Sequence, residues 1–378
     1  MDRATAAAAE VARINTYFPL LPRMGLGWAA RRPWEDTTIA VNAHLTTLTA
    51  ALLRELALGG GEWVVCAANE HTTDPGVVEL LRQQGIQVYT GRDNNHRHRA
   101  TLDAEPELIV DVGYELIRTL MDQRADQATS VRAGIEITRT GINRLRRRPP
   151  PFGVMNINDG ALKHNVENRH GVGEGLWPAV TRITGMHLSG RKALVIGYGP
   201  TGQGLAHYAR GLGASVEVIE VDPIRRLVAL YDGFPCPTLE EGLERADIAV
   251  TVTGTSGALP LERLEAVESD LILVNAGHGS DEIDVKGLRG AAVEGDELGP
   301  HCVRYRLRSD GPWLSVLGKG NPLNIVLNAG SPEPVLLHFA LLGHTLEHLA
   351  NTRITPGEHL VPKLLESQVA ELAFKARR

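Results

Sequence analysis

The stretch "ALVIGYGPTGQG", residues 193–204, decides the fold of this 378-residue chain. Its glycines Gly197, Gly199 and Gly202 form the pattern G-x-G-x-x-G between an apolar run and a helical pattern. The first glycine permits a tight turn, the second lets the backbone approach a pyrophosphate, and the third allows helix and strand to pack closely. The free N–H groups that begin the helix can bind phosphate. The stretch therefore predicts a Rossmann dinucleotide site, with Thr201 on its loop.

An acidic residue strengthens this glycine pattern, which is weak when it stands alone. Glu220 ends the next apolar run, where a carboxylate can bind both hydroxyls of an adenosine ribose. The residues that follow, Val221, Asp222 and Pro223, include no arginine to hold a 2′-phosphate. We therefore predict NAD, and not NADP, as the cofactor.

Composition and charge exclude several classes of protein. A hydrophobic content of 43% is ample for buried cores, and the net charge of −6 with interspersed acids and bases argues against nucleic-acid or membrane partners. Cys66, Cys236 and Cys302 are too far apart for a zinc set or a disulfide framework, so we expect no metal site. No apolar run approaches the roughly 18 residues that span a bilayer. We predict a cytoplasmic protein.

Short apolar runs alternate with helical patterns along both halves of the chain, which predicts parallel α/β sheets. The expected strands lie at 37–44, 62–69, 86–91, 107–113, 192–197, 215–222, 246–254 and 270–277. Two basic stretches break the alternation. "NNHRHR" (94–99) resembles a metal tract and "RRRPPP" (146–151) a basic docking patch, but both are better interpreted as solvated loops.

The stretch "NINDGALKHNVENRHG", residues 156–171, is unusual because no helical or strand period organises its polar residues. It precedes the glycine pattern and concentrates short, directional polar groups, among them Asn158, Lys163, Glu167 and Asn168. Such groups suit a site that positions a ligand.

The order "NIND…K…N", "GYGPTGQG", "VIEVDPI", "TVTG" and "NAGHGSDEID" resembles the S-adenosylhomocysteine hydrolase family. "VNAHLTTLTAALLREL" and "CAANEHTTD" resemble the substrate domain of that family, so the resemblance covers nearly the whole chain. It implies two α/β domains: a Rossmann NAD-binding domain, expected at 158–332, and a discontinuous Rossmann-like substrate domain, expected at 1–157 and 333–378. It also implies bound NAD, a nucleoside-type substrate and a homodimer or homotetramer.

The resemblance implies a reaction with an internal redox cycle. A ribose 3′-hydroxyl is oxidised to a ketone, which makes the C4′ hydrogen acidic. A base removes that proton, the 5′ substituent leaves, a nucleophile adds, and the ketone is reduced.

Five residues match catalytic positions of the family. Lys163 matches the lysine beside the 3′-hydroxyl, and Asn158 matches an asparagine near it. His44 matches a histidine near the 5′ leaving group, and His278 matches one near the sugar. Glu167 stands where the family has an aspartate, so a carboxylate is retained on a longer side chain.

The resemblance implies further contacts to cofactor and substrate. Asn324 matches the asparagine that orients the nicotinamide carboxamide. The other expected cofactor-binding residues are Thr138, Thr140, Asn168 and Thr253. The expected substrate-binding residues are Thr46, Thr49, Glu136 and Ser331.

The departures from the family pattern concentrate at the base and the 5′ end. Val112 stands at the position of an acid/base aspartate, and Leu48 at that of a glutamate that binds the adenine amino group. Ile137 occupies the place of a ribose-binding glutamate, although Glu136 is adjacent, and Ser331 replaces a base-pocket histidine. These changes predict altered chemistry at the 5′ carbon.

We therefore hypothesise a hydrolase- or lyase-like enzyme that oxidises a nucleoside and eliminates a 5′ group. Dehydration would give a 4′,5′-unsaturated product of the kind found in angustmycin-like nucleoside antibiotics. Three alternatives stay open: hydrolysis of S-adenosylhomocysteine in one-carbon metabolism, C4′ epimerisation, and a non-catalytic NAD-binding protein. The family's carboxy-terminal tail has no counterpart after "AELAFKARR" (370–378), which predicts looser cofactor retention and favours a dimer.

Overall fold

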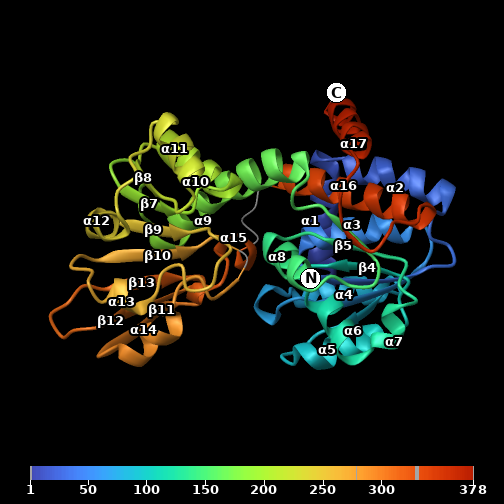
Figure 1. Ribbon diagram of the computed structural model, residues 1–378, viewed down its shortest axis with the longest axis horizontal. Coiled ribbons are helices and arrows are strands. Elements are labelled where there is room, and N and C mark those ends of the chain that lie inside the picture. The colour runs from blue at the N-terminus through green and yellow to red at the C-terminus, as the bar shows by residue number, and fades with distance from the viewer. Residues whose placement is uncertain (1, 278, 328–331, 378) are drawn as a thin grey trace. The chain divides into compact units, whose positions relative to one another are not determined.

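The computed structural model describes residues 2–277, 279–327 and 332–377 (Figure 1). It divides into two compact units: unit 1 comprises Met1–Glu167 and Pro332–Arg378, and unit 2 comprises Asn168–Ser331. Each unit is built on a seven-stranded sheet with helices on both faces. The predicted α/β fold class is confirmed.

The sheet of unit 1 is parallel throughout. The chain builds outward from β1 to β2 and β3 on one side, and then to β4, β5 and β6 on the other. In spatial order the strands are β14 (Gly357–Leu360), β6 (Gly153–Asn156), β5 (Ala133–Glu136), β4 (Leu108–Asp111), β1 (Thr38–Ala43), β2 (Glu62–Ala67) and β3 (Gln87–Tyr89).

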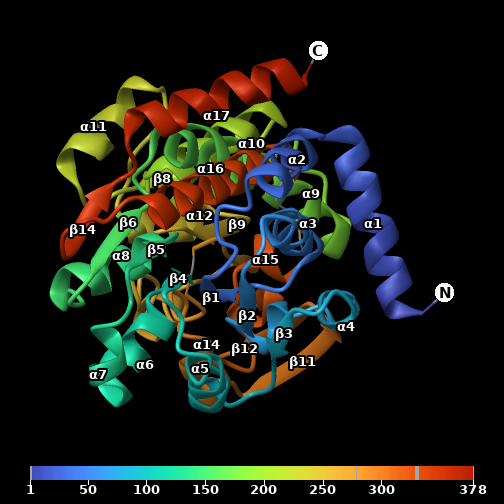
Figure 2. The ribbon, with the colours of Figure 1, turned by 90° about the vertical axis from the view of Figure 1, so that its right-hand side faces the viewer.

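Helices cover both faces of this sheet because its strands are apolar on both sides (Figure 2). One face packs on α1 (Arg3–Tyr17), α2 (Leu20–Arg31), α3 (Thr47–Ala57), α4 (Pro75–Gln83), α16 (Pro332–Asn351) and α17 (Lys363–Ala376). The other packs on α5 (Asn94–Leu102), α6 (Glu115–Gln123), α7 (Ala125–Ala128) and α8 (Arg139–Arg147).

The sheet of unit 2 places β7 at the point where the strand order reverses. From β7 the chain first adds β8 on one side and then β9 and β10 on the other. Strand β12 runs antiparallel to both of its neighbours. In spatial order the strands are β11 (Glu294–Gly299), β12 (Cys302–Arg306), β13 (Leu314–Leu317), β10 (Leu271–Asn275), β9 (Ile248–Thr251), β7 (Lys192–Ile196) and β8 (Ser215–Ile219).

Alternate residues of β7 point to opposite cores of unit 2: Val195 belongs to one cluster, and Leu194 and Ile196 to the other. The helices of this unit are α9 (Gly173–Thr184), α10 (Pro200–Gly211), α11 (Pro223–Tyr231), α12 (Leu239–Arg245), α13 (Leu261–Leu264), α14 (Val285–Ala291) and α15 (Leu323–Val326). Short 3-10 turns lie at Glu70–Thr72 in unit 1 and at Gly318–Gly320 in unit 2.

Two stretches predicted to lack helical order are helical. Residues 94–99 begin α5, because the Asp93 side chain accepts a hydrogen bond from His96 N at 3.1 Å and caps the helix. The loop prediction was wrong because Arg97 is buried, where it donates to Ala67 O at 2.9 Å. Lys163–Val172 forms a π-helix, although its sequence shows no helical period.

The units divide about ten residues later than the predicted boundary at 157. Residues 158–167 group with unit 1, where Leu162 N donates to the Glu366 carboxylate of α17 at 3.1 Å. The second division precedes Pro332, one residue before the predicted position.

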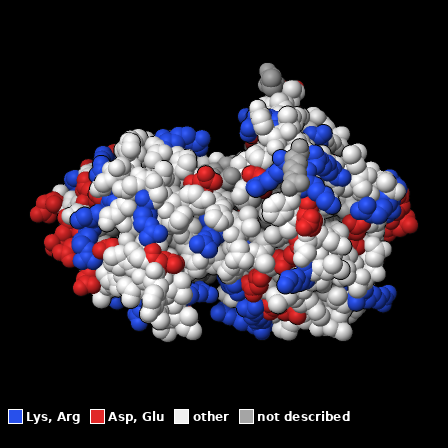
Figure 3. Space-filling view, turned by 90° about the horizontal axis from the view of Figure 1, so that it is seen from above, with Lys and Arg blue, Asp and Glu red and all other residues white. Residues whose placement is uncertain are grey.

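On the face displayed in Figure 3, Lys and Arg are interspersed with Asp and Glu. Among the described residues, no helix is both long and apolar enough to cross a membrane.

Candidate functional site

The candidate residues of unit 1 follow the carboxyl ends of its strands. His44 and Thr46 follow β1, Thr138 follows β5, and Asn158 follows β6, while Glu136 is the last residue of β5. The strand order reverses between β1 and β4, and open parallel sheets bind their ligands beyond such a point. The fold therefore brings residues from separate parts of the sequence to one edge of the sheet.

Lys163 and Glu167 form an ion pair within the π-helix, in which Lys163 Nζ donates to Glu167 Oε2. The two side chains are only 11% and 8% exposed, respectively. Burial weakens the competition from water, so this pair is held more firmly than one on the surface. It places an amine, fixed by a carboxylate, at the position predicted for catalysis.

Asn158 is held by Asp159, a residue to which the sequence analysis assigned no role. Asn158 Nδ2 donates to Asp159 Oδ1 at 2.7 Å, and Asn156 Nδ2 donates to Asp159 Oδ2 at 2.9 Å. Burial acts to raise the pKa of Asp159, but these amides and the charges of Arg139 and Arg146 hold it below its ordinary value. Asp159 is therefore an anion that fixes the "NIND" turn.

His44 begins a second cluster at the same edge. Its Nδ1 lies 2.7 Å from the hydroxyl oxygen of Thr72, which comes from the segment after β2. Thr49 Oγ1 donates to His44 O at 2.6 Å, and Thr46 Oγ1 accepts from Thr49 N at 3.4 Å to cap α3. Thr46 and Thr49, predicted to bind substrate, thus hold the turn that carries His44.

Glu136 is fully buried, and its carboxylate accepts hydrogen bonds from its own surroundings. Its oxygens accept from Gly113 N at 3.1 Å, Tyr114 N at 2.7 Å and Thr138 N at 2.7 Å, and Thr138 Oγ1 also donates at 2.8 Å. Burial and the nearby charge of Asp111 raise the pKa of Glu136 to about 8. The structure thus brings Glu136 and Thr138 to each other, where they fix the turns after β4 and β5.

His338 on α16 is a buried polar residue that the sequence analysis did not identify. It is 2% exposed, and neither ring nitrogen has a hydrogen-bond partner among the described residues. Burial and the positive charge of Lys163 lower its pKa well below the ordinary value, so the ring is neutral. Its apolar context in "LLHFALL" gave no sequence signal for a role.

The glycine loop of unit 2 has the geometry that its pattern predicts. Gly197 has a φ of 109°, and a Cβ there would lie 2.8 Å from Val252 O. A Cβ on Gly202 would lie 2.0 Å from Gly197 O, so helix α10 packs directly against the turn. Thr201 lies in the first turn of α10. By contrast, the one atom of the described residues beyond its chain neighbours that a Cβ on Gly199 would have within 4 Å is Arg225 Nη1, at 3.9 Å.

Glu220 follows β8 and braces this loop. Its Oε2 accepts from Tyr198 N at 2.7 Å, and its Oε1 accepts from Asp222 N at 2.9 Å. Each carboxylate oxygen keeps a second lone pair for a ribose hydroxyl.

Glu282, for which no role was predicted, holds the loop after β9 by accepting hydrogen bonds from it. Its Oε2 accepts from Thr253 N at 2.9 Å and from Thr253 Oγ1 at 3.0 Å, while its Oε1 accepts from Gly254 N at 2.7 Å. Glu282 is 1% exposed, and burial raises its pKa. The position of Thr253, a predicted cofactor residue, therefore depends on a carboxylate that follows β10 in the chain.

The remaining predicted site residues are Asn324, Asn168, Thr140, His278 and Ser331. Asn324 Oδ1 is buried with no hydrogen-bond partner among the described residues, as expected for an atom that awaits a ligand N–H. Asn168 and Thr140 are partly exposed. His278 and Ser331 lie outside the described residues. The open space at Gly199, the Glu220 carboxylate and the Asn324 oxygen together fit a dinucleotide.

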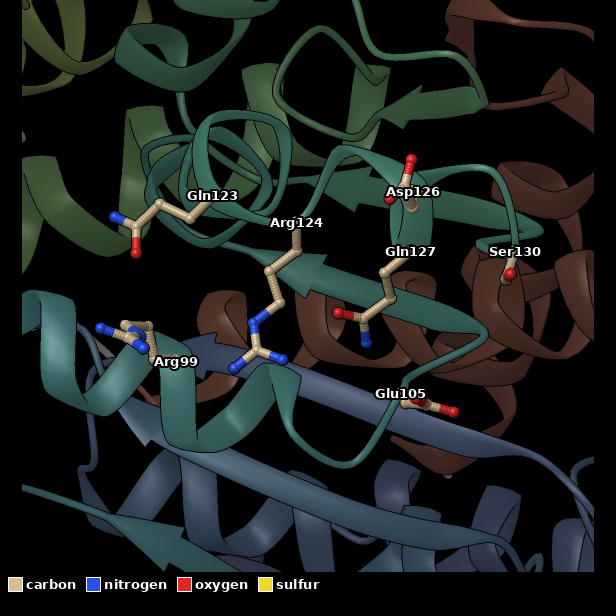
Figure 4. A pocket seen from close by; sticks show the side chains of 7 residues that line it. All are labelled: Arg99, Glu105, Gln123, Arg124, Asp126, Gln127 and Ser130. Atoms are coloured by element: carbon tan, nitrogen blue, oxygen red, sulfur yellow. The ribbon is translucent and has the colours of Figure 1, made fainter.

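A polar pocket of about 870 Å³ lies elsewhere in unit 1 (Figure 4). Its lining includes Glu105, which precedes β4, and Ser130, which precedes β5. The pocket is therefore at the amino ends of these strands, opposite the edge that carries the candidate residues, and none of those residues lines it.

Comparisons with known proteins agree with the geometry of unit 2. The family model described as "S-adenosyl-L-homocysteine hydrolase, NAD binding domain" matches residues 168–330. The adenosylhomocysteinase of Thermococcus kodakarensis is 32% identical over 372 residues, which cover 95% of this chain and 88% of that protein. The S-inosyl-L-homocysteine hydrolase of Methanopyrus kandleri is 33% identical over 373 residues, with coverages of 95% and 88%. These matches confirm NAD as the cofactor, and the chain belongs to the S-adenosyl-L-homocysteine hydrolase family.

Proposed function

We propose that this protein oxidises the 3′-hydroxyl of a nucleoside, removes the C4′ proton, eliminates the 5′ substituent and then returns the hydride to the 3′-ketone. The observation that carries the proposal is the buried Lys163–Glu167 pair at the family's catalytic position. A surface helix gains little from such a pair, whereas proton transfer at a sugar hydroxyl needs an amine held in place.

The residues divide the work as follows. When bound, NAD supplies the hydride acceptor for C3′. In its neutral form Lys163 takes the hydroxyl proton, and Glu167 keeps the amine in position. Asn158, fixed by Asp159, orients the sugar. His44, held against Thr72, exchanges a proton at the 5′ end, because an imidazole can both donate and accept near neutral pH.

The 5′ end supports a leaving group other than homocysteine. Val112 is buried and apolar where the family has an acid/base aspartate. The Glu136 carboxylate accepts hydrogen bonds from neighbouring backbone groups, Tyr114 N and Thr138 N. Without these carboxylates the site lacks a base that would activate water for addition at C5′, so elimination with no nucleophile added back suits it, and His44 is left to protonate a leaving group such as hydroxide. We therefore place the enzyme in specialised nucleoside metabolism, as a dehydratase-like lyase.

A second candidate is hydrolysis of a nucleoside thioether, which the names of the relatives favour. Leu48, buried where the family has a glutamate that binds the adenine amino group, refines this candidate. Inosine carries a carbonyl oxygen where adenosine carries that amino group, and one relative is named for S-inosyl-L-homocysteine. A hypoxanthine base would not need the missing glutamate.

The test is to incubate the protein with NAD and one nucleoside at a time in deuterated water. The panel comprises adenosine, inosine and the two S-nucleosidyl-homocysteines, and products are identified by mass spectrometry. A 4′,5′-unsaturated product, with deuterium at C4′ of the recovered starting nucleoside, supports the proposal, and release of a homocysteine thiol supports the second candidate. Deuterium in a C4′-inverted nucleoside, with no elimination product, identifies an epimerase. If neither exchange nor reduced nicotinamide appears with any member of the panel, both candidates fail and the non-catalytic alternative stands. Lys163→Met is the matched control.

A further inference from the structure

The strongest unassigned feature of the cofactor domain is the side chain of Arg225. Arg225 lies in the first turn of α11. It follows Glu220, whose carboxylate accepts a hydrogen bond from Tyr198 N of the glycine loop. Arg225 Nη1 would be 3.9 Å from a Cβ on Gly199, and among the described residues beyond Gly199 and its chain neighbours no other atom lies within 4 Å of that point. The Arg225 guanidinium therefore lies beside the glycine loop, next to the open space at Gly199. At the second glycine of this pattern, the absence of a side chain lets the backbone approach a pyrophosphate.

The acids nearest to Arg225 in sequence are engaged elsewhere. Glu220 accepts from Tyr198 N at 2.7 Å and from Asp222 N at 2.9 Å. Asp222 accepts from Ile224 N and Arg225 N, both at 2.9 Å. Among the described residues, the Arg225 side chain is exposed and has no hydrogen-bond or ion-pair partner. An arginine presents five N–H donors in a fork that fits phosphate oxygens, so an unpaired one beside a phosphate-binding loop is a ready ligand.

We propose that Arg225 binds a phosphate of the dinucleotide, an interaction that the glycine pattern and Glu220 do not provide. An arginine directly after the ribose-binding acid indicates NADP and not NAD, and this chain has Val221 at that position. Arg225 reaches the same loop from the helix that follows. Two phosphates have the required chemistry: the pyrophosphate, which approaches Gly199, and a 2′-phosphate on the adenosine ribose. The inference rests on the dinucleotide site and not on the reaction proposed above.

The experiment measures binding and not turnover. The full-length chain, freed of bound nucleotide, is titrated with NADH and separately with NADPH, and binding is followed by nicotinamide fluorescence. Arg225→Ala is expected to weaken binding of at least one of them about tenfold, the typical effect of losing a charged hydrogen bond. Arg225→Lys keeps the positive charge but not the forked guanidinium, so its affinity is expected to lie between those of the parent and of Arg225→Ala. The affinity of the parent is expected to fall with salt more steeply than that of Arg225→Ala.

The neighbouring Arg226 provides the matched control, because it is exposed on the same helix and no atom of it lies within 4 Å of a Cβ on Gly199. Arg226→Ala is expected to leave both affinities within about twofold of the parent. Equal losses for NADH and NADPH in Arg225→Ala assign the contact to the pyrophosphate, and a larger loss for NADPH assigns it to the 2′-phosphate. Unchanged affinity for both nucleotides, in a variant with the parent's thermal unfolding, overturns the proposal.

Discussion

Lys163 and Glu167 form an ion pair with little access to water, since their side chains are 11% and 8% exposed. Removing one partner would leave the other as an uncompensated buried charge. We therefore expect Lys163→Met and Glu167→Gln each to lower the free energy of unfolding by ~3 kcal/mol. The double variant Lys163→Met/Glu167→Leu is expected to recover most of that loss, because it buries no charge. Urea denaturation measures all three.

The exposed pair of Arg263 and Glu240 is the control for this prediction. Its side chains are 51% and 54% exposed, so Arg263→Ala is expected to cost less than ~1 kcal/mol. If the double variant at Lys163 and Glu167 loses as much stability as the two single variants combined, the pair is not coupled as described.

Glu282 is expected to control cofactor affinity through the loop that it holds. Glu282→Ala leaves Thr253 N and Gly254 N without their acceptor, a loss of ~1–3 kcal/mol for each buried group that stays unpaired. NADH binding should weaken by about tenfold or more, because Thr253 loses its position. Asp281→Ala removes only an exposed contact to Ser256 and should bind NADH normally. Equal affinities for the two variants would contradict this role.

Two glycines of α10 should respond oppositely to alanine. At Gly202 a Cβ would lie 2.0 Å from Gly197 O, so Gly202→Ala must displace the loop and should abolish measurable NADH binding. At Gly211 a Cβ meets no atom within 4 Å, so Gly211→Ala should stabilise the protein by ~0.5–1 kcal/mol through lower unfolded-state entropy. Thermal unfolding and fluorescence titration give both answers. Normal binding by Gly202→Ala would show that the turn is not the cofactor site.

Glu136 predicts how stability depends on pH. Its pKa is about 8 in the folded protein and ordinarily 4.5, so between these values the folded form retains a proton that the unfolded form has lost. Raising the pH across this window therefore favours unfolding, by up to ~1.4 kcal/mol per pH unit for this one group. Glu136→Gln cannot titrate, and its stability should fall less between pH 5 and 8. Parallel curves for parent and variant, from urea denaturation at each pH, would reject the assignment.

Local patterns in the chain were sufficient to predict much of the architecture. The glycine pattern and the acid after the next strand predicted the turn, strand and helix from Lys192 to Glu220, because each of these features depends on neighbouring residues. The stretch 94–99 failed the same approach. Its polar composition favours a solvated loop, yet contacts with distant strands bury Arg97 and make the helix stable.

The partners of the site residues could not be read from local patterns. Glu282 reaches the loop after β9 from a position 29 residues later, and His338 comes near Lys163 only because α16 returns to unit 1. Val112 illustrates the converse, since the sequence alone shows that its side chain cannot transfer a proton.

The alternation of strands and helices and the dinucleotide turn could be predicted from the chain alone, because they follow from residue type and short spacing, whereas the missing carboxylate at Val112 is implied by the family resemblance. Only the tertiary structure decided that Glu136 faces backbone donors, that Lys163 and Glu167 are shielded from water, and that Arg225 stands over Gly199. The physical reason is that hydrogen bonding and burial are set by groups that folding brings together from distant parts of the chain.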